Sequence, residues 1–221
     1  MLEAIFFDLD DTLCNTSASR FERARLVADV IRGHDSTFSV SALIEMLLTP
    51  MAGTPWPQGP RPILEKLGLA ETDAGQRARG LWFFRGCEHL MGSYENRDDT
   101  IRLLVSKFRL GVITNGDDAI QRHKFDALGL AHHFEVFVTS EVAGAFKPDA
   151  AIFHHALSRL GIDASRAAFV GDNLEVDVVG AQQSGMRAIW FNPDGLELPA
   201  PVTPDAIVAC YAGLPVVLAG L

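Results

Sequence analysis

The feature that most constrains the fold is a regular alternation of short apolar runs and helix-like segments over residues 98–221. Two kinds of segment alternate there: apolar runs typical of buried strands (110–114, 136–140, 167–170 and 187–191) and helix patterns (99–108, 118–128, 150–160 and 174–184). A last strand and a short helix beginning near Pro215 are expected within residues 206–221. Strands that alternate with helices predict right-handed β-α-β units and a parallel sheet with helices on both faces.

Another apolar run, over residues 2–7, predicts a buried strand that stops at Asp8, Asp10 and Asp11. Clustered carboxylates repel one another and resist desolvation, so packing alone does not explain them. Oxygen ligands without a nearby His or Cys favour a hard cation such as Mg2+. A polar turn is the simpler alternative, because Asp is common in turns. The spacing excludes an EF-hand, since Leu13 and Ser19 stand where that loop needs Gly and Glu.

Residues 15–97 show no convincing strand and predict an all-helical insertion. Helix patterns cover residues 17–31, with Gly33 as the expected end, and residues 39–48, 63–67 and 73–91. Five prolines within residues 50–62 predict an extended loop between them. We therefore expect an α/β core formed by residues 1–14 and 98–221, interrupted by a helical domain of residues 15–97.

Polar residues follow each predicted strand, and ligands of open parallel sheets bind beyond the carboxyl ends of the strands. These residues are Asp8 and Asp10, then Thr114, Asn115, Gly116 and Asp117, then Lys147 and Pro148, and finally Gly171, Asp172, Asn173 and Asp177. Each piece alone has a simpler explanation as a turn, a solvated lysine or a helix N-cap. Together they supply carboxylates, a hydroxyl, an amide and an ammonium, which are the groups needed to hold a metal and phosphoryl oxygens.

Composition narrows the classes of function. The chain has 221 residues, is 48% apolar and carries a net charge of −9, which argues against binding nucleic acid or an anionic membrane. Scattered Cys14, Cys87 and Cys210 predict free thiols in a reducing compartment, and no signal-peptide pattern is visible, so a cytoplasmic location is expected. Walker A, GxGxxG and GxSxG motifs are absent, and the adjacent histidine pairs do not have the spacing of metal ligands.

Four segments resemble the signature motifs of the haloacid dehalogenase superfamily. They are Asp8-Leu9-Asp10-Asp11-Thr12, Thr114-Asn115-Gly116, Lys147-Pro148 and Gly171-Asp172 with Asp177 five residues after Asp172. The resemblance covers nearly the whole chain and implies a Rossmann-like core with a helical cap inserted after the first strand. Within the superfamily, the Thr-Asn-Gly and Phe-Lys-Pro forms look most like phosphatases of the nucleotidase and sialic-acid-phosphate kind.

The resemblance implies a Mg2+-dependent phosphatase that acts on a small phosphorylated metabolite, for example a nucleoside monophosphate or sugar phosphate. Asp8 would be the nucleophile that forms an aspartyl-phosphate, and Asp10 the acid and base. Thr114, Asn115 and Lys147 would contact the phosphoryl oxygens. Mg2+ would be held by Asp8, by Asp10 through its backbone carbonyl and by Asp172, whereas a supporting role behind these ligands is expected for Asp177. The molecule would be a monomer or homodimer.

The resemblance assigns selectivity to the helical cap. Candidate residues with suitable chemistry are Trp56, Arg61, Trp82, Arg85 and His89. Trp82, Arg85 and His89 recur at helical spacing and are expected to share one helix face. The simpler alternative is that Trp82 belongs to the core and Arg85 to the solvated surface.

Three other functions stay open. A 2-haloacid dehalogenase would not need Asp10 or a metal, so Asp10 counts against it. A phosphomutase would keep the same residues. A receiver-type signalling domain also uses an acceptor Asp with Thr, Lys and Mg2+, but it would have its acceptor on a later strand and no helical block after the first strand.

Overall fold

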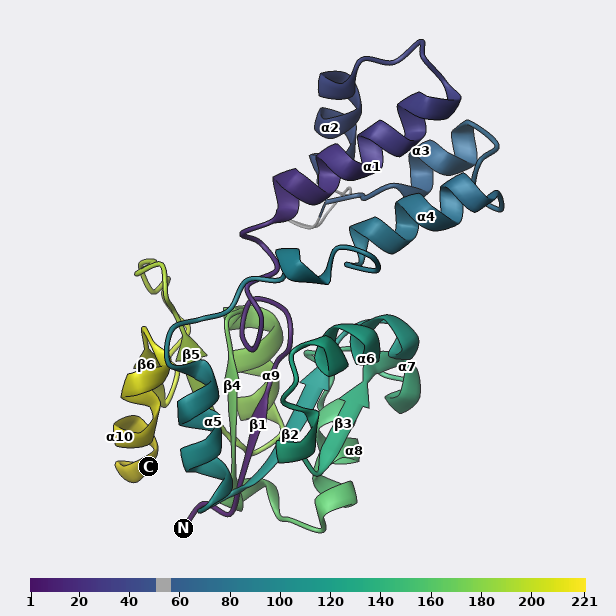
Figure 1. The fold of residues 1–221 in the computed structure, drawn as a ribbon. Coiled ribbons are helices and arrows are strands. Elements are labelled where there is room, and N and C mark those ends of the chain that lie inside the picture. The colour runs from purple at the N-terminus through teal and green to yellow at the C-terminus, as the bar shows by residue number, and fades with distance from the viewer. Residues whose placement is uncertain (51–56) are drawn as a thin grey trace. The chain divides into compact units, whose positions relative to one another are not determined.

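Six parallel strands form one sheet in the order β3-β2-β1-β4-β5-β6 (Figure 1). The computed structural model describes residues 1–50 and 57–221. The strands are β1 Ala4–Phe7, β2 Arg109–Thr114, β3 Val136–Thr139, β4 Ala167–Gly171, β5 Arg187–Phe191 and β6 Ala206–Val208. The predicted parallel α/β architecture is confirmed, and the predicted strands differ from the observed ones only at their ends.

The centre of this sheet determines where the polar residues gather. β1 lies between β2 and β4, with Phe7 opposite both Val112 and Val170. Because all three strands are parallel and in this register, their carboxyl ends lie at the same edge. Residues that follow β1, β2 and β4 therefore meet there, as expected for an open α/β sheet.

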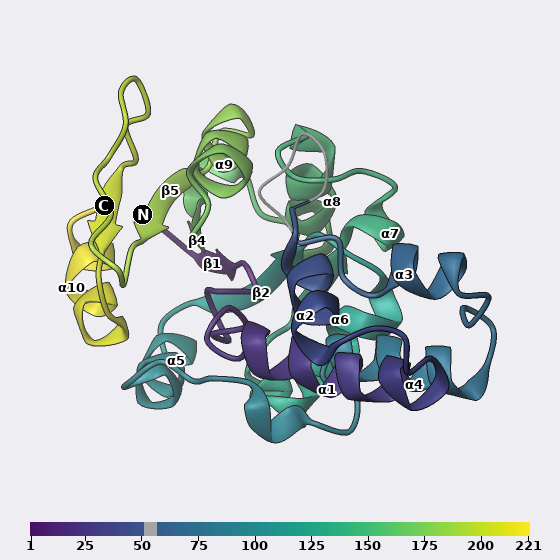
Figure 2. The same ribbon diagram turned by 90° about the horizontal axis from the view of Figure 1, so that it is seen from above.

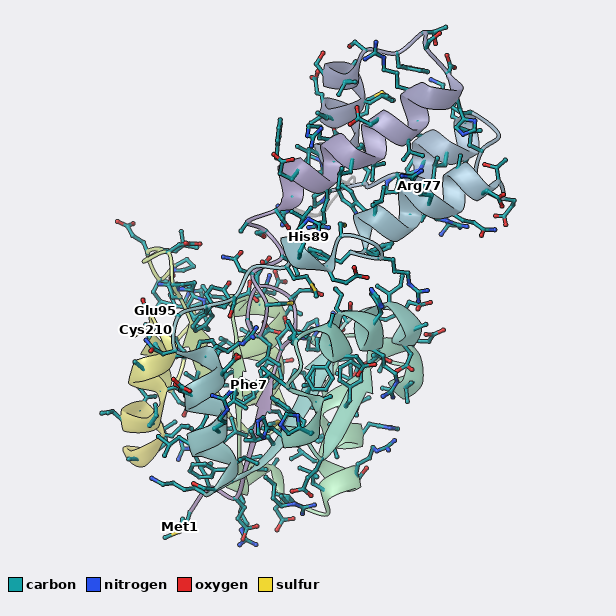
Figure 3. The ribbon with its side chains drawn as sticks, viewed as in Figure 1. Met1, Phe7, Arg77, His89, Glu95 and Cys210 are labelled. Carbon is teal, nitrogen blue, oxygen red and sulfur yellow. The ribbon has the colours of Figure 1, made fainter. Side chains whose placement is uncertain are left out.

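Helices cover both faces of the sheet, as predicted. Successive side chains of a strand point to opposite faces, so Ile5 and Phe7 pack on one side and Ala4 and Phe6 on the other. The first side is covered by α5 Arg97–Val105, α6 Asp118–Ala127 and α10 Leu214–Ala219. The second side is covered by α8 Ala150–Leu160 and α9 Gly180–Gln183 (Figure 2). Figure 3 shows Phe7 inside this part of the molecule.

The segment after β4 differs from the single helix predicted over residues 174–184. It begins as the π-helix η4 Leu174–Val179 and continues as α9. The Val178 N–H donates to the Asn173 carbonyl at 3.2 Å, a bond five residues apart that widens the turn. The Asn173 side chain accepts from the N–H groups of Glu175 and Val176. Wide turns of this kind occur often at functional sites, and this one carries Asp177.

Shorter elements complete the α/β unit. They are α7 Ser140–Ala143 and the 3-10 helices η2 Ala131–His133, η3 Ala164–Arg166 and η5 Tyr211–Gly213. The chain divides into two compact units: this α/β unit, Met1–Asn15 with Ser93–Leu221, and a helical unit, Thr16–Gly92.

The helical unit has its own apolar core. Its helices are α1 Arg20–His34, α2 Val40–Leu48, α3 Arg61–Lys66, α4 Asp73–Trp82 and the 3-10 helix η1 Glu88–Leu90. Side chains including Val27, Ile31, Leu43 and Leu47 pack together in it. Buried Arg23 on α1 donates to the carbonyls of Thr16 and Trp82 and lies over the ring of Phe84. Among residues 16–50 and 57–92 no strand forms, in agreement with the helical prediction.

Two helix ends in this unit were predicted wrongly. α1 continues through Gly33 to His34. The pattern over residues 73–91 is not one helix, because Phe84 (φ 68°) and Gly86 (φ 84°) are left-handed and end α4 at Trp82. Arg85 and His89 therefore follow the helix, and the prediction that they share a helix face with Trp82 was wrong.

The other candidate residues of this unit have ordinary structural environments. Trp82 is buried in the core, whereas Arg85 and His89 are exposed. Arg61 is exposed and pairs with Glu65 one turn along α3. Residues 51–56 of the predicted proline-rich loop, which include Trp56, lie outside the described residues, and α3 begins inside the predicted loop, at Arg61.

No helix within residues 1–50 and 57–221 has both the length and the apolar character needed to cross a membrane. Cys14, Cys87 and Cys210 are free thiols, as predicted.

Candidate active site

An ion-paired lysine joins two of the strand ends. Lys147 is 4% exposed, and its ammonium group donates to Asp8 Oδ1 at 2.7 Å and to Asp177 Oδ1 at 2.6 Å. Burial alone would lower the pKa of Lys147, but Asp177 and Asp8 together hold this pKa above its ordinary value. Lys147 is therefore a permanent positive charge beside the carboxylate that ends β1.

The remaining carboxylate of the site, Asp172, is oriented by neighbours that the sequence does not reveal. The Thr12 hydroxyl donates to Asp172 Oδ1 at 3.2 Å, and the Trp190 indole N–H donates to the Asp172 carbonyl at 2.8 Å. Trp190 lies on β5, opposite Gly171 in register. Asp172 is consequently fixed through both its side chain and its backbone.

Asp177 reaches the site because Gly171 leaves room for it. A Cβ atom at Gly171 would lie 2.4 Å from Asp177 Oδ2 and 2.5 Å from the Asp177 Cβ, closer than real atoms approach. Asp177 Oδ2 accepts the Asn173 N–H at 3.0 Å while Oδ1 binds Lys147. In the Gly171-Asp172 sequence at the end of β4, the glycine thus makes room for buried Asp177, and the aspartate is itself a residue of the site.

The three acids around Lys147 are suited to a divalent cation. Oxygen atoms of Asp8, Asp172 and Asp177 all lie within 4.8 Å of one another. Burial raises the pKa of Asp8 to about 7, with Lys147 opposing the rise and Asp177 adding to it. Burial, followed by the negative charges of Asp177 and Asp8, raises the pKa of Asp172 to about 8. One lysine does not balance this charge, and an all-oxygen donor set fits a hard cation such as Mg2+.

Asn115 holds the loop that carries the lysine. Its side-chain amide donates to the Lys147 carbonyl at 3.0 Å and accepts the Lys147 N–H at 2.8 Å. Both ends of the Asn115 side chain are thus engaged by the backbone of Lys147.

Asp10, two residues after Asp8, pairs with residues on α6 that the sequence analysis missed. The Lys124 ammonium lies 2.6 Å from each carboxylate oxygen of Asp10, and the Gln121 amide donates to Asp10 Oδ2 at 2.9 Å. Gln121 also donates to Thr114 Oγ1 at 2.6 Å. The available signal was their spacing of three residues on a helix that begins directly after Thr-Asn-Gly.

Three long side chains hold the loop after Asp10. Tyr94, Arg97 and Tyr211 donate to the carbonyls of Asp11, Leu13 and Thr12, respectively. Asp11 itself is left-handed, with φ 55°, so its backbone forms the turn. The Asp117 side chain caps α6 by accepting the Ile120 N–H. Local turn and capping roles therefore account for Asp11 and Asp117.

These features define an α/β enzyme whose site lies at the carboxyl edge of a parallel sheet and combines three acids that could hold a metal ion with a buried lysine. The family profile described as haloacid dehalogenase-like hydrolase matches residues 2–185. The chain therefore belongs to this family, in its phosphatase branch, and is a phosphoric monoester hydrolase with the family's fold and cap.

Two relatives and one solved structure illustrate the likeness. Glyceraldehyde 3-phosphate phosphatase of Methanothermobacter thermautotrophicus is 33% identical over 198 residues, which is 88% of this chain and 87% of the relative. Human N-acylneuraminate-9-phosphatase is 27% identical over 98% of this chain and 94% of its own. A crystal structure of 2-haloacid dehalogenase from Pseudomonas syringae pv. Tomato has a TM-score of 0.68 and 32% identity, and the match covers 100% of this chain and 99% of the other.

Proposed function

We propose that this chain is a Mg2+-dependent phosphatase that hydrolyses a small phosphate monoester through an aspartyl-phosphate on Asp8. The observation that carries the proposal is the cluster at the sheet edge. There, buried Lys147 contacts Asp8, and carboxylate oxygens of Asp8, Asp172 and Asp177 lie close enough to one another to share a metal ion. Phosphate monoesters are among the slowest substrates to hydrolyse unaided, so a site of this charge density suits the reaction.

In the first step, a carboxylate oxygen of Asp8 forms a bond to phosphorus while the bond from phosphorus to the leaving oxygen breaks. Lys147 contacts Oδ1 of Asp8, so the attacking oxygen would be Oδ2. Asp10 in its protonated form gives a proton to the leaving oxygen, which departs as an alcohol, and the second step returns this proton from water. Thr114, the last residue of β2, and the backbone N–H of Asn115 would hydrogen-bond the phosphoryl oxygens.

In the second step, water attacks the phosphorus of the aspartyl-phosphate and Asp10 takes its proton. The bond between Asp8 and phosphorus breaks, which returns the carboxylate and releases inorganic phosphate. Asp8 and Asp172, with the Asp10 backbone carbonyl, are the groups that would hold Mg2+, which would neutralise charge on the phosphoryl oxygens. Asp177 would keep Lys147 in place, since its two oxygens contact Lys147 and the Asn173 N–H.

We further propose that the helical unit is the cap that selects the substrate. It contains a hollow of about 810 Å³ between α1 and α4, which is a suitable size for a small metabolite. Leu26 and Val30 give this hollow apolar walls, and its polar walls carry both signs of charge or neutral polar groups, from Asp29, His34, Asp73, Arg77 and His89. Substitution of His89 by Ala should change KM for the preferred metabolite more than KM for p-nitrophenyl phosphate, whereas equal changes would contradict a selecting role.

A phosphate-release screen tests the proposed function. The panel should contain glyceraldehyde 3-phosphate, N-acylneuraminate 9-phosphate, nucleoside monophosphates and sugar phosphates, each with Mg2+ and with EDTA. We expect turnover that EDTA abolishes and that Asp8→Asn lowers by several orders of magnitude. The exposed acid Asp126 on α6 provides a matched control, and Asp126→Asn should keep full activity. Near-normal turnover by Asp8→Asn would refute the mechanism.

The same assay separates the other activities. Isomerisation of a sugar phosphate without release of inorganic phosphate would identify a mutase. Halide release from a 2-haloacid without any phosphatase activity would favour a dehalogenase. Stable phosphorylation without turnover would favour a signalling receiver. Asp10 argues against a dehalogenase. A carboxyl group at this position can protonate an alcohol leaving group, whereas a dehalogenase would not need it.

A further inference from the structure

We propose that Gln121 and Lys124 on α6 are positioning residues that fix the carboxylate of Asp10 and the hydroxyl of Thr114 for phosphoryl transfer. This inference rests on the proposed function, because it concerns the same site. It adds two residues that lie on the helix after the Thr-Asn-Gly turn and outside the family-like motifs.

The two side chains are buried although both are strongly polar. Gln121 is 2% exposed and Lys124 is 5% exposed. They lie three residues apart on α6 and therefore on one face of the helix. A buried ammonium is costly unless it is paired, and even a buried ion pair adds little net stability compared with apolar residues. A contribution to stability is thus a weak explanation for the burial of Gln121 and Lys124, and their contacts indicate a role in the active site.

Lys124 holds Asp10 through both oxygens of the carboxylate. The ammonium nitrogen lies 2.6 Å from Oδ1 and 2.6 Å from Oδ2. The Asp10 side chain keeps 35% of its surface exposed, so the carboxylate stays accessible while Lys124 holds both of its oxygens. A contact to both oxygens restricts rotation of the carboxylate. Lys124 therefore determines the direction in which Asp10 can exchange a proton.

Gln121 connects Asp10 to the phosphoryl-binding residues. Its single amide nitrogen lies 2.9 Å from Asp10 Oδ2, 2.6 Å from Thr114 Oγ1 and 3.0 Å from the Asn115 carbonyl. Because the Thr114 oxygen accepts a hydrogen bond from Gln121, its own hydrogen points to a different acceptor. Gln121 thereby leaves the Thr114 hydroxyl as a donor, which is the role needed toward a phosphoryl oxygen.

Gly116 makes room for this arrangement. A Cβ atom at Gly116 would lie 3.0 Å from Gln121 Cγ and 3.1 Å from Gln121 Cδ, and φ there is 143°. The glycine of the Thr-Asn-Gly turn therefore allows Gln121 to pack under the turn. The turn and the Gln121 side chain form one structural unit that spans the end of β2 and the first turns of α6.

Comparing substrates with different leaving groups tests the role of Lys124. An alkyl phosphate such as glycerol phosphate needs a proton on its leaving oxygen, whereas p-nitrophenolate leaves without one. The readout is kcat/KM, which reports the transfer to Asp8 and excludes the later hydrolysis step. General acid catalysis contributes about 10²–10⁴-fold, so we expect Lys124→Met to lower kcat/KM for the alkyl phosphate about 100-fold. The loss for p-nitrophenyl phosphate should be under about 10-fold.

Gln121→Met should give a different pattern. It removes the donor to Thr114, which contacts the phosphoryl group common to both substrates, so kcat/KM should fall about equally for both. Lys124→Arg keeps a cation and should restore the alkyl-to-aryl ratio. The neighbouring exposed residue on α6 supplies the control, and Arg122→Met should match the wild type.

Equal losses on both substrates for Lys124→Met, or no loss, would overturn the assignment of Lys124. If Lys124→Met does not fold, Lys124→Gln keeps an uncharged donor and should still lower the ratio; an unchanged ratio would overturn the inference. A wild type that releases no phosphate from either substrate with Mg2+ would refute the proposed function, and the inference with it. An active wild type with unaltered variants would refute the inference alone.

Discussion

Lys147→Met is the substitution whose consequences can be worked out in most detail. Lys147 is 4% exposed and pairs with two carboxylates, Asp8 at 2.7 Å and Asp177 at 2.6 Å. Methionine has a similar volume, so the main change is the loss of the charge. Two buried acids then face each other without their cation.

The expected loss of stability follows from those contacts. Removing one partner of a buried ion pair costs about 3–5 kcal/mol, because the other partner is left charged and buried. For a chain of this length each kcal/mol lowers Tm by about 2–4 °C, so Tm should fall by roughly 6–20 °C at pH 8. Activity should fall by at least about 100-fold, as for other lost electrostatic contacts to a transition state.

The effect should depend on pH with a definite sign. In the metal-free wild type, burial raises the pKa of Asp8 from 3.8 to about 7. A folded state with a raised acid pKa binds more protons than the unfolded chain, so stability falls as pH rises from about 4 to 7. Lys147 lowers the pKa of Asp8. In the Lys147→Met variant this effect is lost, so the stability of the folded protein falls more steeply as pH rises. The difference between variant and wild type should therefore be small near pH 4 and largest near pH 8.

Thermal unfolding in EDTA at pH 4.5, 6 and 8 measures this difference. The exposed Lys107 in the same unit provides the control, and Lys107→Met should leave Tm nearly unchanged at every pH. Adding Mg2+ at pH 8 should recover part of the loss, because a dication replaces the missing charge. A loss of Tm that is the same at all three pH values would refute the electrostatic explanation and indicate a packing defect instead.

Three further predictions follow from other contacts. Gly171→Ala should destabilise the protein by roughly 1–3 kcal/mol and lower turnover, because its Cβ would displace Asp177 from Lys147; unchanged urea unfolding would contradict this account. Ser39→Ala removes the side chain that accepts the Ala42 N–H at the start of α2 and should cost about 1 kcal/mol without changing kcat. Mg2+ at about 100 times its Kd should stabilise the wild type by about 2.7 kcal/mol in unfolding experiments, and Asp172→Asn should largely lose this effect.

The sequence by itself determined the α/β architecture and which polar segments gather at one edge of the sheet. Apolar runs of strand length and helical periodicity are local signals, and their alternation leaves few topologies. Because the carboxyl ends of parallel strands meet, the sequence also indicated that Asp8, Thr114, Lys147 and Asp172 would come together. The structure brings these four segments to one edge of the sheet.

The ends of the helices in the helical unit were less predictable. Residues 73–91 carry a helical pattern throughout, yet the left-handed backbone at Phe84 and Gly86 ends α4 and separates Arg85 and His89 from it. Periodicity describes an average over a window and does not report one left-handed residue. The π-turn of η4 is a similar case, because its hydrogen bonds to Asn173 depend on the local backbone.

Only the tertiary structure decided which polar side chains contact one another. The spacing of Gln121 and Lys124 puts them on one face of α6, but the sequence does not show that Lys124 pairs with Asp10, because that contact joins residues 114 positions apart. The same holds for Trp190 behind Asp172 and for the tyrosines that hold the loop after Asp10. Local propensity determines the elements, whereas contacts between distant residues depend on strand order, register and helix packing, which exist only in the folded chain.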